Sequence, residues 1–580
     1  TTKEGREGKL QVQFRVENSL SMNSSETELA DPITFMKLHN EAVRTRNPLG
    51  ILPYMDSEIA AREAGKNPYV YPVVDWKDML LQNHTMNQRG NLSLSGGGKV
   101  ARYYVALSYA RDNGLLKSDP MNNFDSNINL NKYTVRTNVN MNLTKTTELA
   151  VRVSGSFDDY SGPLSGGADM YNKAVRANPV LFPAVYAPDK KHEYVNHLMF
   201  GNYGDNGEYM NPYAELVKGY KESQETHVVA QLELNQNLEM ITEGLNFRIK
   251  GHVTRNSAYD TSRSFTPFYY SVGGYDKLTD VYTLTPLNET SGTDYLAYKE
   301  GGKKVDGALY LEAALSYDRT FNDDHNVSGL LVYTAQENKT GNAGSLELSL
   351  PGRNLGLAGR FTYGYKEKYF GEFNFGYNGS ERFDRSHRWG FFPSGGIGWM
   401  ISNEDFWKNW GISKYVNTLK VRATYGLVGN DQIDREDINR FFYLSQVNMD
   451  DGGKGYNFGY EFGEHSNGVS IGRYANPDIG WEIAHKLNLG LETKLFNSLD
   501  FNLDVFTEKR ENILQERADI PSLIGLQQPQ KANIGVAKAH GFEFSIDYQK
   551  VFNKDFWLTV RGNYTYATSK YDVYEEPDYT

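Results

Sequence analysis

The length, composition and charge of the chain exclude several classes of protein. Its 580 residues are too many for one ordinary core, its formal net charge is −11, and it contains no cysteine. An acidic chain lacks the basic surface that releases counterions from nucleic acid, and a chain without cysteine forms no disulfide, thiolate metal site or catalytic thiol. No apolar run of about 18 residues could form a transmembrane helix, and the N-terminal TTKEGREGKL has no apolar stretch of a signal peptide.

Alternation of apolar and polar residues predicts strands along the whole chain. The clearest strand covers residues 132–143. Its apolar face carries Tyr133, Val135, Thr137, Val139, Met141 and Leu143. Its polar face carries Lys132, Thr134, Arg136, Asn138, Asn140 and Asn142. A soluble sheet would bury the apolar face against another layer, whereas a transmembrane barrel would turn it toward lipid and the polar face toward a wet lumen.

Seventeen such segments are predicted. They begin near Leu10, Arg89, Ala101, Lys132, Thr147, Thr226, Leu245, Ala308, Asn326, Leu357, Tyr369, Phe392, Thr418, His485, Leu499, Gly541 and Asp555. The 41 tyrosines and 55 glycines suit a barrel with aromatic girdles and large loops. Because bacterial single-chain barrels have an even number of strands and must close, the odd count predicts a barrel that continues beyond Thr580.

Long and short connections alternate between the predicted strands. The long ones cover residues 21–88, 160–225, 429–484 and 511–540, and a further loop starts at Asn113. The short ones are 96–99, 144–146, 240–244, 366–368, 496–498 and 551–554. Outer-membrane barrels have short periplasmic turns and long extracellular loops, so the alternation favours a membrane barrel over a soluble sandwich.

Helices are predicted inside the connections. Asp31 and Pro32 are typical of an N-cap followed by a first-turn proline, Asp75 caps a second helix, and residues 168–177 form a third. The aromatic segment 403–415 is the exception, because it falls at a periplasmic position. Its Phe406, Trp407 and Trp410 either anchor the membrane interface or pack inside the segment.

Motifs that suggest enzymatic or metal chemistry have simpler interpretations. SGGGK (residues 95–99) lacks the hydroxyl and the helix that follow the lysine of a phosphate-binding loop, so it indicates a hairpin turn. MDDGGKGYN (449–457) lacks the spaced acidic ligands of a calcium loop, which favours a solvated loop tip. The carboxylates offer no reason to pair any two as in a glycosidase, and no HExxH zinc motif occurs. The chain is therefore not expected to be an enzyme or to bind a metal or cofactor.

Aromatic residues of the long connections are the better candidates for substrate binding. Tyrosine faces grip sugars and peptides together with a few polar groups. The candidates are Tyr209, Tyr213, Tyr269, Tyr270, Tyr456 and Tyr460. The alternative is that they pack the loops together or contact a protein partner. Polar inner-face residues are expected to contact lumen water and a plug; they are Arg136, Asn138, Asn140, Gln231, Glu233 and Asn235.

One block carries a family resemblance. RWGFFPSGGIGWMISNEDF (388–406) resembles the (R/W)GyFPS…GW…E.F signature of the SusC/RagA class of TonB-dependent transporters of Bacteroidetes. Further blocks similar to this family lie at residues 1–9, 71–83, 92–114, 373–383, 419–433, 476–492 and 505–514.

The resemblance implies a 22-stranded outer-membrane barrel of which about 17 strands are present. Residues 1–9 would then end the connection from a plug domain, and residues 10–580 would form a barrel incomplete at its C-terminus. It also implies import of an oligosaccharide or an oligopeptide under a SusD-like surface lipoprotein lid, with energy from the TonB–ExbB–ExbD complex acting on the plug. A dimer of transporter–lipoprotein pairs is implied too.

Two other functions stay open at this point. A passive outer-membrane porin would share the strands and the loop alternation but would have no plug. A secreted all-β carbohydrate-binding protein or enzyme would bury its apolar faces against each other and would be soluble without detergent.

Overall fold

The computed structural model describes residues 3–24, 27–120, 122–204, 207, 209–433 and 440–577. Contacts divide the chain into two units, one made of 1–140, 152–230 and 254–306 and the other of 141–151, 231–253 and 307–580. Among the described residues, no helix is both long enough and apolar enough to span a bilayer.

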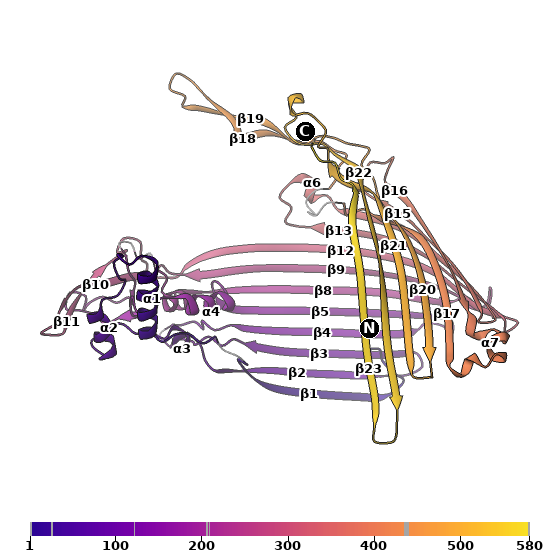
Figure 1. Ribbon diagram of the computed structural model, residues 1–580, viewed down its shortest axis with the longest axis horizontal. Helices are drawn as coiled ribbons and strands as arrows, with labels where there is room; N and C mark the ends of the chain where they lie inside the picture. The colour runs from indigo at the N-terminus through magenta and orange to yellow at the C-terminus, as the bar shows by residue number, and fades with distance from the viewer. Residues whose placement is uncertain are drawn as a thin grey trace. The chain divides into compact units, whose positions relative to one another are not determined.

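One 17-stranded antiparallel sheet dominates the chain (Figure 1), and it confirms the predicted number of strands. Strands of this sheet that are consecutive in sequence are also hydrogen-bonded neighbours in space. The strands of the N-terminal half are β1 (Gly8–Met22), β2 (His84–Gly97), β3 (Ala101–Asn113), β4 (Asn129–Asn142), β5 (Thr147–Pro163), β8 (Gly219–Asn237), β9 (Leu245–Ser264) and β12 (Ala297–Phe321). The others are β13 (His325–Thr340), β14 (Gly352–Tyr365), β15 (Tyr369–Ser380), β16 (Trp389–Met400), β17 (Val416–Asn430), β20 (Glu482–Leu495), β21 (Leu499–Glu516), β22 (Lys531–Val551) and β23 (Trp557–Val573).

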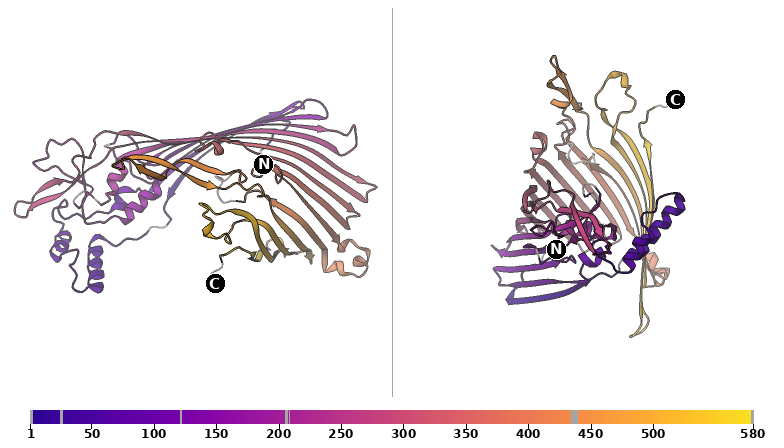
Figure 2. Two further views of the ribbon diagram at one scale, coloured as in Figure 1. Left: turned by 90° about the horizontal axis from the view of Figure 1, so that it is seen from above. Right: turned by 90° about the vertical axis from the view of Figure 1, so that its left-hand side faces the viewer.

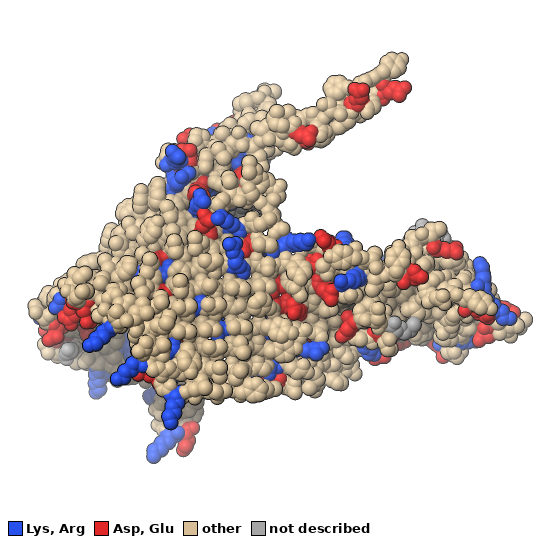
Figure 3. Space-filling model, turned by 180° about the vertical axis from the view of Figure 1, so that it is seen from behind, with Lys and Arg blue, Asp and Glu red and all other residues tan. Residues whose placement is uncertain are grey.

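The register separates an apolar face from a polar face. Phe361 of β14 lies opposite Phe373 of β15, and Tyr377 of β15 lies opposite Phe391 of β16. These four rings are exposed and lie on one apolar face of the sheet. In a membrane barrel such a face is in contact with lipid. Figure 3 shows this kind of surface over the strands, where most residues are uncharged and many charged ones lie toward the margins.

The opposite face carries charged side chains that form ion pairs between neighbouring strands. Arg422 of β17 donates to Glu492 of β20 at 3.0 Å and to Asp504 of β21 at 2.6 Å. Arg360 of β14 donates to Glu372 of β15 at 2.7 Å. A charged inner face and an apolar outer face are the arrangement of a membrane barrel wall.

The two faces predicted for residues 132–143 are also present. Tyr133, Val135 and Leu143 are exposed, whereas Asn138 and Asn140 are buried. Asn138 is buried because the N-terminal segment lies against it, and its Nδ2 donates to the carbonyl of Lys3 at 2.6 Å. The segment that precedes β1 therefore lies against the polar face of β4.

Several strands are longer than alternation predicts. β12 begins at Ala297 rather than near Ala308, and β22 begins at Lys531 rather than near Gly541. A transmembrane strand needs only about 9–11 residues, so strands of 25 and 21 residues project beyond the bilayer. The extension of β12 is exposed on both faces, and that of β22 is half-buried against other connections, so neither requires alternation.

The connections alternate in length as predicted. SGGGK forms the turn between β2 and β3, where Gly98 N donates to Ala101 O at 2.8 Å. The connection 401–415 is the long exception at the short-turn end, and it contains η1 (Ile401–Asn403), α7 (Asp405–Asn409) and η2 (Ile412–Lys414). In this segment Trp407 is nearly buried and its Nε1 donates to Val416 O at 3.1 Å, whereas Trp410 is 68% exposed. Trp407 therefore packs inside the segment, whereas Trp410 keeps an exposed ring beside Phe406, with 5.0 Å between the ring centroids.

The long connections carry the remaining elements. Those of the first unit are α1 (Pro32–Arg46), α2 (Asp56–Glu63), α3 (Trp76–Leu80), α4 (Gly167–Arg176), α5 (Pro212–Val217) and a small sheet of β6 (Val185–Tyr186), β7 (Met199–Gly201), β10 (Phe268–Asp276) and β11 (Val281–Pro286). Those of the second unit are α6 (Leu346–Ser349), η3 (Ser522–Ile524) and a hairpin of β18 (Gln446–Phe458) and β19 (Glu464–Arg473). The predicted caps are confirmed, since Asp31 accepts from Ile33 N and Thr34 N, and Asp75 accepts from Asp78 N.

Candidate functional site

Three long connections of the first unit pack into one subdomain, here called the loop subdomain (residues 27–83, 164–218 and 265–296), and Leu116 of a fourth connection joins its largest core. Its elements gather at one end of the strands of that unit in Figure 1 and again in the left view of Figure 2. The largest core joins α3, α4 and α5 around Trp76, Met170, Phe182, Phe200 and Leu216. Each connection alone is too short to bury such a core, so the subdomain depends on contacts between connections.

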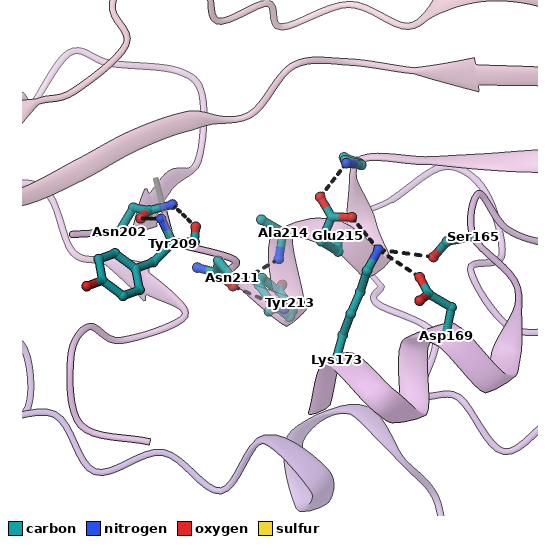
Figure 4. A network of polar contacts seen from close by, with 10 residues as sticks. Ser165, Asp169, Lys173, Asn202, Tyr209, Asn211, Tyr213, Ala214 and Glu215 are labelled. Carbon is teal, nitrogen blue, oxygen red and sulfur yellow. Dashed lines mark hydrogen bonds and ion pairs between the residues drawn. The ribbon is translucent and has the colours of Figure 1, made fainter. Parts of the chain in front are cut away.

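Two buried asparagines hold this subdomain together (Figure 4). Asn211 caps α5, because its Oδ1 accepts from Tyr213 N at 3.0 Å and Ala214 N at 3.1 Å. Its Nδ2 donates to the carbonyls of Ala184 and Gly201, both at 2.9 Å. The side chain is fully buried, and its four bonds satisfy both ends of the amide.

The second asparagine, Asn202, holds the backbone of Tyr203 and Tyr209. Asn202 Oδ1 accepts from Tyr203 N at 2.7 Å and from Tyr209 N at 3.0 Å. Its Nδ2 donates to Tyr209 O at 2.5 Å. The backbone of Tyr209 is therefore held at both its N–H and its carbonyl, while its ring lies edge-on to Tyr203 at 5.7 Å.

A half-buried ion-pair network links α4 to α5. Lys173 lies 2.6 Å from Glu215, 3.0 Å from Asp169 and 3.2 Å from Ser165 Oγ, and Lys218 also pairs with Glu215. Burial alone would raise the pKa of Glu215, but hydrogen bonds from the two lysines outweigh it and lower that pKa. The carboxylate is thus kept ionised inside the subdomain.

The four candidate tyrosines of the first unit all lie in this subdomain, but not in the same environment. Tyr209 is 47% exposed. Tyr213 packs against the largest core and its hydroxyl bonds to Asp119, whereas Tyr269 packs against that core and burial raises its pKa to about 12. Tyr270 is only 4% exposed and its hydroxyl lies 3.0 Å from His197 Nε2. Geometry therefore favours Tyr209 over the other three as a ligand contact.

The remaining two candidates belong to the β18–β19 hairpin of the second unit. Tyr456 is exposed and lies 5.3 Å from Phe458, and Tyr460 is fully exposed. The MDDGGKGYN segment is part of β18, so the prediction of a loop tip there is wrong. The prediction failed because the hairpin is wet on both faces and its sequence shows little alternation.

The inner face of the first unit also offers a polar hollow of about 350 Å³ between β5, β8, β9 and β12. Asp158, Glu225, His227 and Lys304 line it. Asp158 pairs with Lys132 at 3.1 Å and accepts from Ser156 Oγ at 2.9 Å. Such a hollow suits the hydroxyl and amide groups of a polar ligand.

Sequence reasoning missed the carboxylate that anchors the 401–415 connection. Glu404 accepts from Tyr369 Oη at 2.7 Å and Trp399 Nε1 at 3.1 Å, and it pairs with Lys368 at 3.0 Å. These hydrogen bonds lower the pKa of Glu404 to about 2. The available signal was an acidic residue just after an aromatic strand end. Asn211 had a signal as well, because Asn211 followed by Pro212 is the same cap-and-proline pattern as Asp31 and Pro32, whereas Asn202 had none.

The comparison with protein families decides to which family the chain belongs. Residues 75–580 match the family described as TonB dependent receptor-like, beta-barrel. The chain belongs to this family. It is accordingly an outer-membrane β-barrel of a family of transporters and receptors, not of enzymes.

Known relatives narrow the family to its SusC/RagA type, which confirms the resemblance. TonB-dependent receptor P3 of Formosa agariphila is 27% identical over 524 residues, 87% of this chain and 47% of the relative. TonB-dependent receptor SusC of Bacteroides thetaiotaomicron is 22% identical, covering 85% of this chain and 48% of SusC. The chain thus spans about half the length of these curated relatives.

Solved structures support the same fold. The RagAB peptide importer in the "closed-closed" state superposes with a TM-score of 0.66 over 98% of this chain and 62% of that chain, at 16% sequence identity. The "open-open" state of the same importer superposes with a TM-score of 0.68.

Proposed function

We propose that the whole protein imports an oligomeric nutrient, an oligosaccharide or an oligopeptide, across the outer membrane. Transport would be driven by the TonB–ExbB–ExbD complex acting on a plug inside the barrel. The observation that carries the proposal is the family match over residues 75–580. A packed loop subdomain in which the ring of Tyr209 is exposed supports it.

The chemistry of the surfaces supports a polar, oligomeric cargo. An exposed tyrosine ring held by its backbone can stack on a sugar ring or a peptide plane with little loss of entropy. The inner-face hollow adds carboxylate, imidazole and ammonium groups below the loops. Three carboxylates (Asp158, Glu225 and Asp306) and one lysine (Lys304) line it, so its charge favours neutral or basic groups of a cargo over anionic ones.

A SusD-like surface lipoprotein is the proposed partner, as a lid over the loops. The relatives named SusC and RagAB support this part of the proposal. The exposed β18–β19 hairpin and the loop subdomain are the surfaces available for such a lid, and an assembly of two transporter–lipoprotein pairs is the form we propose.

Uptake of labelled cargo in cells tests the proposal. Cells carrying the whole transporter would be given fluorescent oligosaccharides and oligopeptides of graded length, with tonB present or deleted. We expect uptake of one class, saturable and lost without TonB. Uptake that persists without TonB would instead identify a passive porin, and hydrolysis of cargo by the purified protein would identify an enzyme.

A further inference from the structure

An apolar furrow runs over β17 on the lipid-facing side of the second unit. Its volume is about 730 Å³. Its lining includes six apolar side chains of β16, β17 and β20: Ile397, Trp399, Val421, Ala423, Leu489 and Leu491. All six point to the face that carries the other exposed apolar residues of these strands, because each has the same strand parity.

The furrow exists because small residues lie between large ones. Ala423 of β17 pairs across the sheet with Ile397 of β16 on one side and with Leu489 of β20 on the other. Ile397 is 70% exposed and Leu489 is 51% exposed, so both stand above the shorter Ala423. The result is a floor on β17 with a wall on each neighbouring strand.

One end of the furrow is fixed in place. Trp399 stacks on Tyr369 with 6.4 Å between ring centroids and 11° between planes. Both side chains donate to the carboxylate of Glu404, which also pairs with Lys368. Aromatic rings held at the boundary of an apolar surface mark the membrane–water interface.

This end lies at the short turns, which identifies the leaflet. The turn between β14 and β15 spans only residues 366–368, and short turns of outer-membrane barrels face the periplasm. The furrow therefore opens from the periplasmic interface into the hydrocarbon region.

We propose that this furrow is a retained binding site for one acyl chain of an inner-leaflet phospholipid. A chain on the convex barrel surface touches protein on one side only. In the furrow it would contact a floor and two walls, which multiplies its dispersion contacts and slows its exchange. Continuity with the lipid-facing surface, together with the fixed aromatic end, favours a lipid chain over a second protein copy.

Native mass spectrometry of the whole transporter, purified from outer membranes in mild detergent, tests the proposal. Ala423→Phe fills the furrow, and Ala230→Phe is the matched control on the lipid-facing side of β8. We expect one retained phospholipid per wild-type and Ala230→Phe barrel, and at least a tenfold lower occupancy in Ala423→Phe. Val421→Phe is the second furrow variant if Ala423→Phe does not give a heat-modifiable, folded barrel.

Three results would overturn the proposal. Equal phospholipid retention in the filled and control variants would place the lipid elsewhere. A retained lipopolysaccharide in place of the phospholipid would contradict the leaflet. A change of oligomeric state in Ala423→Phe with unchanged lipid content would make the furrow a contact between two copies.

Discussion

Removing the Asn211 side chain should loosen the loop subdomain without unfolding the barrel. In Asn211→Ala, Tyr213 N and Ala214 N lose their cap, which costs about 1 kcal/mol. The buried carbonyl of Gly201 loses a donor as well, at about 1–3 kcal/mol. Ala184 O keeps its bond from Gly201 N at 3.1 Å, so it adds little. The sum is about 2–4 kcal/mol.

Hydrogen exchange measures this loss locally. Because about 1.4 kcal/mol corresponds to a tenfold change, amide protection across α5 and β7 should fall by roughly 30- to 700-fold. Amides of β14, β15 and β16 should keep their protection, since all four hydrogen bonds of the Asn211 side chain lie within the loop subdomain.

Asn211→Asp separates the two contributions. The aspartate keeps an oxygen for the cap but loses the donor and turns a carboxylate toward two carbonyls. It should therefore destabilise at least as much as alanine, even though aspartate is a good cap in general. Protection that changes less than threefold in both variants would refute the assignment of Asn211 as the residue that holds these connections together.

Three further predictions concern the periplasmic anchor, the tyrosines and the barrel wall. The pKa of Glu404 is lowered to about 2, below the ordinary 4.5, so its carboxylate stabilises the fold above pH ~4.5 and this contribution is lost as pH falls toward 2. The difference in melting temperature between wild type and Glu404→Gln should follow that window, and a difference that persists at pH 2 would contradict it. Tyr209→Ala should weaken cargo binding roughly 3- to 10-fold in titration calorimetry with unchanged stability, whereas Tyr270→Phe should cost about 1 kcal/mol of stability and leave affinity unchanged. Leu489→Arg on the lipid-facing side should destabilise the barrel by about 2–4 kcal/mol in urea unfolding from lipid vesicles. Asn502→Arg on the inner face is its control. An equal loss of unfolding free energy in the two variants would contradict the orientation of the wall.

The membrane part of the fold could be predicted because two unlike solvents act on it. Lipid on one side and a wet lumen on the other force alternation at every second residue, as in Tyr133 and Val135 against Asn138 and Asn140. The same rule explains where prediction stopped. At Ala297 the strand already runs through water, and at Lys531 it is held by another connection through Asn476, so polar residues are tolerated on both faces. The register there is kept by backbone hydrogen bonds, which leave no mark in the sequence.

The candidate site was harder to predict for a different physical reason. Tyr269 and Tyr270 are neighbours in sequence, and nothing in their composition says that one packs on the largest core and the other beside His197. Their environments are set by residues distant in sequence, such as His197, which lies 73 positions from Tyr270, and these residues come together only when the connections fold on one another. Aromatic content thus predicted a set of candidate rings, but not which of these rings are exposed.

The anchoring asparagines explain how such a subdomain can carry a binding surface at all. Loops that bind a cargo must expose aromatic rings, and exposed rings contribute little to stability. In this chain the stability comes from the buried apolar cores and from buried polar side chains that hold backbone, since Asn202 fixes both the N–H and the carbonyl of Tyr209. The ring of Tyr209 can then vary with the cargo while its position stays constant. A relative with different cargo would be expected to change the ring before it changes Asn202 or Asn211.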